Sequence, residues 1–239
     1  NVFIQGGTRG LGFAFAQLLA PRSHRLWISG RKMSAELSAL QSGHKNIVYC
    51  PLDLRQASDF ERVATQLQGS EPFELIINAG AVLHQPEGIQ PERRLSQLRA
   101  DFLNQSFQTN AIGPMILLKT LEPWFSKTRL EIVNISAKVG SITDNRLGGW
   151  YGYRASKTAL NMLTHTLALE LKRSHPQAVC VAVHPGTMET ELSRPFRSQV
   201  KHPVWTPQQS AENILNVLSG LSPEQSGRFF AYDGEELPW

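Results

Sequence analysis

The chain has 239 residues, of which 41% are hydrophobic and 18% are charged. This apolar content and the presence of two cysteines exclude a disordered, collagen-like or disulfide-stapled chain. No apolar run approaches the roughly 20 residues that a membrane-spanning helix needs, so we expect no membrane partner. The net charge of +4 and the pI near 9.2 raise the question of a nucleic-acid partner. Because the basic residues are scattered, we expect none.

Short, nearly continuous apolar runs alternate with longer helical patterns along the chain. Apolar runs of this kind are typical of parallel strands that are covered on both faces. The predicted strands are Val2–Gln5, Arg25–Ser29, Ile47–Leu52, Leu75–Asn78, Glu131–Ser136, Val179–His184 and Arg228–Tyr232. The predicted helices are Gly12–Leu19, Ser34–Gln41, Gln56–Gln68, Leu95–Leu118, Tyr153–His175 and Thr206–Leu221. Since Asn1 stands directly before the first strand, we expect a few residues to precede it.

This alternation predicts an α/β Rossmann fold, a doubly wound and mostly parallel seven-stranded sheet with helices on both faces. No repeat or long linker divides the sequence, so we expect one domain over residues 1–239. Cys50 and Cys180 lie in apolar stretches and fit reduced core residues of a cytoplasmic protein. The seven histidines include no pair at i, i+4, which argues against a metal site.

The first predicted strand leads directly into a glycine-rich loop that precedes a helix. Glycines here allow a tight turn and a close approach of the backbone to a pyrophosphate at the helix N-terminus. An ordinary glycine-rich turn is the alternative, but the position between a strand and a helix favours dinucleotide binding. The predicted cofactor contacts in this loop are Gly6, Thr8, Arg9, Gly10, Leu11 and Gly12.

Two arginines indicate which dinucleotide binds. An NAD site usually places an acidic residue near the end of the second strand, whereas this strand ends in Ser29-Gly30-Arg31. Guanidinium groups at Arg9 and Arg31 suit the 2′-phosphate of NADP(H). Two ordinary surface arginines are the alternative. We therefore expect NADP(H) rather than NAD(H) as the cofactor.

A tyrosine and a lysine stand four residues apart at the start of the fifth predicted helix. This spacing places Tyr153 and Lys157 on one helix face. A nearby ammonium group lowers the pKa of a phenol toward neutrality, so that the phenol can exchange a proton at pH 7. The pair is a candidate for acid–base chemistry.

Four motifs in order resemble the short-chain dehydrogenase/reductase family over essentially the whole chain. They are the glycine loop, Asn78-Ala79-Gly80, Tyr153-x-x-x-Lys157 and Pro185-Gly186. The stretches Gly148–Asn161 and Gly227–Trp239 further resemble the C-factor-like and Sniffer-like carbonyl reductase branch. The resemblance implies an NADPH-dependent enzyme that reduces a ketone or aldehyde. An alcohol dehydrogenase working oxidatively and a low-turnover signalling protein of the C-factor type are the alternatives.

The resemblance also implies residue roles. Tyr153 would protonate the carbonyl oxygen, while Lys157 would lower the tyrosine pKa and hold the nicotinamide ribose. Asn110 would anchor a water molecule in the proton relay. The further implied cofactor contacts are Asp53 and Leu54 at the adenine, Asn78, Ala79 and Gly80 along the adenosine, and Pro185, Gly186, Thr187 and Thr190 along the nicotinamide and phosphates. Asp53 also fits an N-cap of a helix over Arg55–Gln68.

The chain departs from the family pattern at the end of the fifth strand. Counting back from Gly140, Ala137 occupies the position of the carbonyl-binding serine. Ser136 is one residue early, and a one-residue step in a strand reverses the side chain. Three alternatives remain: the strand end re-aims Ser136, Ser141 replaces the serine, or Tyr153 holds the carbonyl alone. We nominate Ser136.

A long segment between the sixth strand and the last helix is a candidate lid. It runs from Met188 to Thr206 and carries Phe196 and Trp205, which suggests an apolar or aromatic carbonyl substrate. The loop Ile142–Trp150 would flank the same site. Members of the resembled family often form homodimers or homotetramers through the fourth and fifth helices, whose apolar content permits this here.

Overall fold

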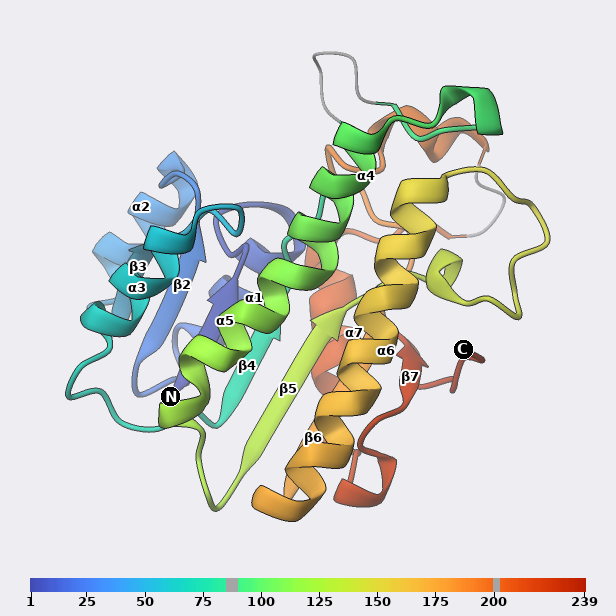
Figure 1. The fold of residues 1–239 in the computed structure, drawn as a ribbon. Helices are drawn as coiled ribbons and strands as arrows, with labels where there is room; N and C mark the ends of the chain where they lie inside the picture. The colour runs from blue at the N-terminus through green and yellow to red at the C-terminus, as the bar shows by residue number, and fades with distance from the viewer. Residues whose placement is uncertain (85–89, 200–202) are drawn as a thin grey trace.

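The computed structural model describes residues 1–84, 90–199 and 203–239. Within them the chain builds a seven-stranded sheet in the order β3-β2-β1-β4-β5-β6-β7, and every neighbouring pair is parallel (Figure 1). The strands are β1 (Val2–Gln5), β2 (Leu26–Gly30), β3 (Ile47–Pro51), β4 (Leu75–Asn78), β5 (Leu130–Ile135), β6 (Ala178–His184) and β7 (Phe229–Ala231). Each predicted strand is confirmed to within one residue at either end. The predicted doubly wound α/β class is confirmed.

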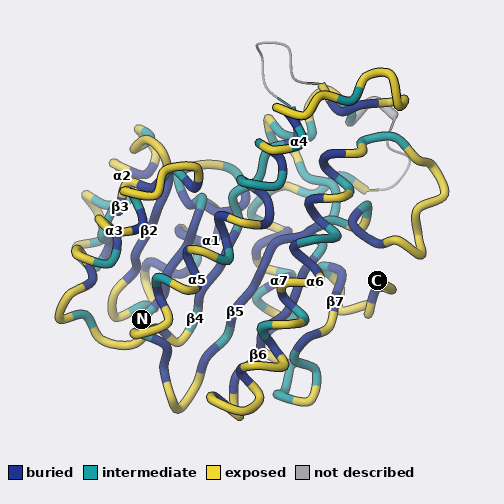
Figure 2. Tube along the Cα trace, in the orientation of Figure 1, coloured by how far each residue is buried: buried dark blue, intermediate teal, exposed yellow. Residues whose placement is uncertain are grey.

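Helices cover both faces of the sheet because successive side chains of a strand point to opposite faces. Phe3 packs in a cluster with residues of α3, α5 and α6, whereas the adjacent Ile4 packs with residues of α1, α2 and α7. Figure 2 shows the continuous buried trace that results along the central strands. The helices are α1 (Gly10–Leu19), α2 (Ala35–Gly43), α3 (Ala57–Gln66), α4 (Ala100–Phe107), α5 (Gly113–Leu121), α6 (Tyr151–Ser174) and α7 (Pro207–Ser219).

The predicted continuous helix Leu95–Leu118 is wrong. The structure breaks this stretch into a 3₁₀ turn at Leu95–Gln97, α4, a π-helical segment at Gln108–Ile112 and α5. Pro114 has no backbone N–H, so it cannot donate the α-helical hydrogen bond to the carbonyl of Asn110. Short π segments occur frequently at functional sites, and this one carries Asn110.

Three buried polar side chains fix α6 to the centre of the sheet. Asn78 and Asn134 are register partners on β4 and β5, and Asn78 Nδ2 donates to Asn134 Oδ1 at 2.7 Å. Asn134 Nδ2 in turn donates to Thr164 Oγ1 on α6 at 2.9 Å. Because buried polar groups need partners, this chain of hydrogen bonds specifies where the helix lies.

The described residues hold neither a candidate membrane span nor a candidate metal cluster. None of their helices combines the length and hydropathy that crossing a bilayer requires. In the same part of the chain, no three His, Cys, Asp or Glu side chains gather in a way that could hold a metal ion.

Candidate active site

The glycine loop lies against the end of β4. Gly6 has φ +78°, and a Cβ there would stand 2.6 Å from the amide nitrogen of Gly80. The Gly80 amide donates to Gln5 Oε1 at 2.9 Å, and the Ala79 amide donates to the Gln5 carbonyl at 2.9 Å. The structure therefore brings together the first two predicted cofactor segments, which are some 70 residues apart in the sequence.

The start of α1 has the features of an anion site. Its N-cap residue Arg9 makes no side-chain capping bond, and the first turn carries no acidic residue. A Cβ on Gly10 would meet nothing nearer than the Thr190 methyl group, at 3.7 Å. The first amides of a helix lack backbone partners and favour a negative group, and the missing side chain leaves room for one. These residues fit the pyrophosphate of a dinucleotide.

The remaining loop residues support the turn from inside. A Cβ on Gly12 would collide with the Gly6 carbonyl oxygen. Leu11 is buried in the core, and Thr8 packs its methyl group against Gly30. Leu11 thus contributes packing rather than an exposed contact surface.

The predicted adenosine side differs in detail from the expectation. Arg9 and Arg31 are both exposed. The Asp53 carboxylate is paired with Arg55 at 2.6 Å, and this pairing lowers the pKa of Asp53, with a smaller contribution from the charge of Arg31. The alternative prediction that Asp53 caps the following helix is wrong, because α3 begins at Ala57 with Gln56 as its N-cap.

Leu54 and Asn78, two further predicted cofactor contacts, are both buried. Leu54 is buried against Gly113, and its carbonyl accepts from Gln108 Nε2 at 3.0 Å. Asn78 is 2% exposed, and its Oδ1 has no hydrogen-bond partner among the described residues. A buried acceptor without a partner is costly, so this oxygen is available to a bound donor.

Tyr153 and Lys157 lie together on the buried face of α6. Tyr153 is 7% exposed and Lys157 is 1% exposed. Lys157 Nζ lies 5.9 Å from the centre of the Tyr153 ring and donates to the Ile135 carbonyl at 2.7 Å. Burial raises the pKa of Tyr153 well above its ordinary value and lowers the pKa of Lys157 to about 7.

These shifts correct the expectation that Lys157 brings the tyrosine pKa toward neutrality. Desolvation disfavours the charged form of both groups, and it is the cause of both shifts. Tyr153 is consequently a protonated phenol at neutral pH. That is the form required of a general acid.

Asn110 connects the π-helical segment to the same helix face. Its Nδ2 donates to Ser156 Oγ at 3.0 Å and to the Val82 carbonyl at 2.9 Å, while its Oδ1 accepts from the Val82 amide at 2.7 Å. Ser156 Oγ donates to the Tyr153 carbonyl at 2.8 Å. Asn110 therefore fixes both the loop that follows β4 and the first turns of α6.

Neither candidate serine is bonded to Tyr153 in the described structure. Ser136 is 2% exposed, and its hydroxyl donates to Asn161 Oδ1 at 2.6 Å. Ser141 donates to the Trp239 carbonyl at 3.1 Å. The strand end does not re-aim Ser136, because its amide still donates to the Val183 carbonyl of β6. The nomination of Ser136 therefore loses its geometric basis.

The predicted lid is anchored at both ends. The Trp205 amide donates to the Thr187 carbonyl at 2.8 Å, and the Glu189 amide donates to the Trp205 carbonyl at 2.8 Å. A Cβ on Gly186, where φ is +76°, would stand 2.9 Å from the Trp205 ring. The segment also contains a 3₁₀ turn at Arg194–Gln199, so part of it has regular structure. Residues 200–202 of this segment lie outside the described residues.

Pro185 and Thr190 hold the beginning of that segment. The Pro185 carbonyl accepts from Ser210 Oγ at 2.7 Å, which joins the end of β6 to α7. The Thr190 side chain and Ser193 lie within hydrogen-bond distance of each other, at 3.3 Å. Of the four predicted residues in this segment, Thr190 lies beside the glycine loop, since a Cβ on Gly10 would be 3.7 Å from its methyl group.

An aromatic cluster packs against Tyr153, and the sequence indicated it only in part. The Trp150 ring lies 6.2 Å from the Tyr153 ring and 4.8 Å from the Phe196 ring. His84 packs edge-on against Phe196 at 5.9 Å, and its Nε2 lies 3.1 Å from the Glu191 carbonyl. These residues come from three separate loops, so no local spacing indicates them. Phe196 lies in the predicted lid and Trp150 ends the predicted flanking loop, whereas the sequence did not indicate His84.

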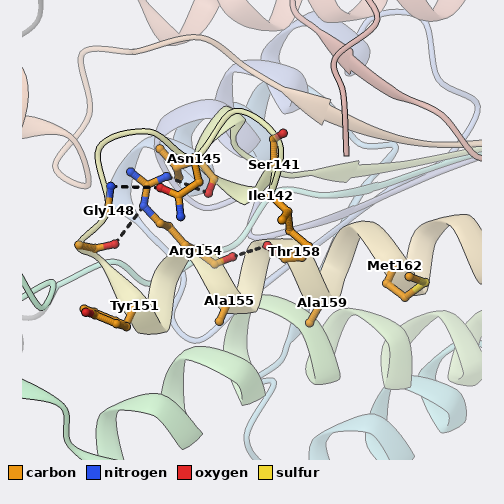
Figure 3. Close-up of a pocket in the computed structure, with 12 residues that line it drawn as sticks. Ser141, Ile142, Asn145, Gly148, Tyr151, Arg154, Ala155, Thr158, Ala159 and Met162 are labelled. Atoms are coloured by element: carbon orange, nitrogen blue, oxygen red, sulfur yellow. Dashed lines mark hydrogen bonds between the residues drawn. The ribbon is translucent and has the colours of Figure 1, made fainter. Parts of the chain in front are cut away.

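The loop Ile142–Trp150 was expected to flank the substrate site at Tyr153, but residues 142–149 of this loop line a different hollow. With the outer face of α6 it encloses a hollow of about 700 Å³, and neither Tyr153 nor Lys157 is among its lining residues (Figure 3). Arg154 crosses the hollow and donates to the carbonyls of Gly149 and Val139. Only the end of the predicted flanking loop, Trp150, reaches Tyr153.

Comparisons with known proteins identify the family. The family model described as short chain dehydrogenase matches residues 1–201. The chain belongs to the short-chain dehydrogenase family. Over 137 residues it is 35% identical to the C-signal of Myxococcus xanthus, an overlap that covers 56% of this chain and 77% of that protein.

Two solved structures of carbonyl reductases resemble this short-chain dehydrogenase over its whole length. The NADPH-bound carbonyl reductase from chicken fatty liver is 26% identical, with a TM-score of 0.86 and coverage of 100% of this chain and 93% of that one. The carbonyl reductase Sniffer of D. melanogaster is 27% identical, with a TM-score of 0.86 and coverage of 100% and 99%. The resemblance to the carbonyl reductase branch and the expectation of an oxidoreductase are thereby confirmed.

Proposed function

We propose that this short-chain dehydrogenase is an NADPH-dependent carbonyl reductase in which Tyr153 is the general acid. The observation that carries the proposal is a buried phenol that lies beside Lys157 and packs against the Trp150 ring. The likeness of the chain to an NADPH-bound carbonyl reductase supports the same reaction. NADPH, when bound, would supply the hydride.

The chain's own residues would divide the remaining work. Tyr153 would donate its proton to the carbonyl oxygen, which becomes the hydroxyl oxygen of the alcohol product. Lys157, whose pKa of about 7 allows both protonation states, would bind the ribose beside Tyr153 and pass a proton on. Asn110 would hold the first turns of α6 in place through Ser156 and support the proton relay.

We also propose that no serine assists Tyr153. Ala137 occupies the position of the family serine, and the hydroxyls of Ser136 and Ser141 are bound to Asn161 and to the Trp239 carbonyl. The carbonyl oxygen would then be held by Tyr153 alone. Ser136→Ala and Ser141→Ala should each keep kcat within about threefold of the wild type, since neither removes a contact to the reacting atoms.

The cofactor preference follows from the two exposed arginines. Arg9 and Arg31 are exposed, and β2 ends without an acidic residue. We therefore propose that their guanidinium groups bind the 2′-phosphate of NADPH. The remaining predicted contacts, from Asp53 to Thr190, would follow the dinucleotide along the carboxyl ends of the strands.

The aromatic cluster indicates the substrate class. Trp150, Phe196 and His84 would cover a carbonyl compound bound at Tyr153, which favours apolar or aromatic ketones and aldehydes over sugar-like ones. NADPH consumption with a panel of both classes tests this. Turnover confined to the polar compounds would refute it.

A low-turnover role in signalling is the second candidate, favoured by the likeness to C-signal and by Ala137. The two proposals differ in one comparison. A reductase consumes NADPH with a carbonyl compound and loses this activity in Tyr153→Phe. A signalling protein binds NADPH but shows the same negligible turnover in both forms.

Two further proposals concern the protein's surroundings. Cys50 and Cys180 are both free and buried, which fits the reducing cytoplasm.

Apolar side chains of the π-helical segment, α5 and α6 are exposed and would support self-association as a dimer or tetramer, which light scattering can measure. They are Ile112, Ile116, Met162, Leu163 and Leu169.

A further inference from the structure

A buried glutamate outside the catalytic set contacts the start of the Tyr153 helix. Glu92 lies between β4 and α4 and is 2% exposed. Its Oε2 accepts from the Gly152 amide at 3.1 Å, and its backbone carbonyl accepts from the Trp150 amide. One residue from a distant loop thus holds two amides within the first turn of α6.

These contacts replace a cap that the helix does not supply itself. The first amides of an α-helix have no intrahelical partners, and the N-cap residue Trp150 makes no side-chain capping bond. A carboxylate at this end is also favoured by the helix dipole. Glu92 supplies both the acceptor and the charge from 60 residues away.

The contacts of Glu92 to the Trp150 and Gly152 amides bear on the Trp150 and Tyr153 rings. Trp150 has φ +53°, a left-handed conformation that is unfavourable for a non-glycine residue and persists only where its surroundings enforce it. Its ring packs against Tyr153, which directly follows Gly152. The orientation of the Trp150 ring and that of Tyr153 therefore depend on the same glutamate.

The carboxylate is closely fitted to Gly152. A Cβ on Gly152 would stand 3.1 Å from Glu92 Oε1, 3.3 Å from Leu103 Cδ2 and 3.4 Å from Ser106 Oγ. Glu92 Oε1 and Ser106 Oγ are both buried without a hydrogen-bond partner among the described residues, and they share this one small space. A Cβ at position 152 would therefore require the Glu92 carboxylate, its nearest neighbour, to shift by a few tenths of an ångström.

We propose that Glu92 is a positioning residue for carbonyl reduction, which sets the orientation of Tyr153 and Trp150 through Gly152. The inference rests on the proposed reductase function. Glu92 acts through its neighbours and touches no reacting atom. A purely stabilising role would lower the melting temperature without changing the geometry of the reaction, so the test must measure that geometry.

The experiment uses one prochiral aryl ketone and NADPH, with the wild type, Glu92→Ala and Glu92→Gln. Misplacement of a reacting group by about 1 Å costs up to about a hundredfold in rate. We expect Glu92→Ala to lower kcat at least about tenfold, to reduce the enantiomeric excess of the alcohol, and to leave the Kd for NADPH within about twofold. Glu92→Gln keeps an acceptor for the Gly152 amide, so it should restore kcat to within about threefold and the enantiomeric excess of the wild type.

Two further variants keep the result interpretable. Gly152→Ala displaces the carboxylate without removing it, and it should reproduce the loss of enantiomeric excess even if Glu92→Ala does not fold. Phe73→Leu changes a fully buried side chain just before β4 that is not among the contacts of Glu92 or Gly152, and it controls for lost stability. Wild-type kcat and enantiomeric excess in Glu92→Ala, or in Gly152→Ala if the former is unfolded, would overturn the inference. So would an equal loss in Phe73→Leu. Full activity of Tyr153→Phe would instead overturn the proposed function itself.

Discussion

Lys157 Nζ lies 5.9 Å from the centre of the Tyr153 ring, and its hydrogen bond goes to the Ile135 carbonyl rather than to the phenol. The ammonium group is thus buried with one neutral acceptor. Because burial disfavours its charge, the pKa of Lys157 falls from 10.5 to about 7. The consequence is that Lys157 contributes to the dependence of stability on pH, and its removal isolates that contribution.

Stability should rise with pH above neutrality. Below about pH 7 both the folded and the unfolded chain bind the Lys157 proton, and the cost of burying the charge is fully present. Between about 7 and 10.5 the unfolded chain binds a proton that the folded chain does not, so the free energy of unfolding increases. From pH 7 to 9 the cofactor-free wild type should gain about 1–3 kcal/mol relative to Lys157→Met in urea titrations. Parallel curves for the two proteins would contradict this.

The polar chain from Asn78 through Asn134 to Thr164 should be a main source of stability. Asn134→Ala removes the partners of both neighbours, and each buried polar group left unpaired costs about 1–3 kcal/mol. We expect a loss of about 2–5 kcal/mol in chemical denaturation. Thr164→Val keeps the shape of the side chain but removes its bonds to Asn134 Nδ2 and to the Leu160 carbonyl, and it should cost about 1–2 kcal/mol. If the two substitutions cost the same, the chain does not act as a unit.

Gly186 should tolerate no side chain. Its φ of +76° is unfavourable for other residues by about 1–2 kcal/mol, and a Cβ would lie 2.9 Å from Trp205 and 3.0 Å from Tyr232. Gly186→Ala should therefore destabilise the protein and weaken NADPH binding at least about fivefold, because it pushes the anchored lid away from the cofactor edge. Gly220→Ala is the control, since Gly220 has φ −97° and its nearest neighbour lies at 3.6 Å. Unchanged NADPH affinity in Gly186→Ala would disprove the role of this anchor.

The arginine pair should decide the cofactor. Arg31→Asp places a negative charge where we propose that the 2′-phosphate binds, so the ratio of kcat/KM for NADPH over NADH should fall at least about tenfold. Lys45→Asp makes the same change of charge at another exposed position and should leave the ratio unchanged. A wild-type protein that already prefers NADH would contradict the assignment.

The architecture could be predicted closely because its cause is local. Continuous apolar runs identify strands covered on both faces, and each run ended within one residue of the observed strand. The helix predicted over Leu95–Leu118 failed because the apolar pattern continues through Gly113-Pro114, while Pro114 cannot donate to the Asn110 carbonyl and the turn before it is π-helical.

The candidate site was predicted less completely because contacts between distant segments shape it. The family motifs indicate Tyr153, Lys157 and the glycine loop. The direction of the Tyr153 pKa shift could not be predicted, since it depends on burial by Trp150 and its neighbours rather than on the spacing to Lys157. Glu92 and His84 belong to none of the motifs and carry no local pattern. Their roles follow from contacts to the start of α6 and to Phe196.

The central claim is that Tyr153 protonates a carbonyl group while the cofactor reduces it. The most direct measurement follows deuterium from NADPH labelled at the transferable position into the alcohol formed from an aryl ketone. We expect the wild type to place deuterium on the carbonyl carbon, and Tyr153→Phe to do so at least about a hundredfold more slowly with an unchanged Kd for NADPH. Equal transfer by Tyr153→Phe, or none by the wild type from any carbonyl compound of the panel, would contradict the account.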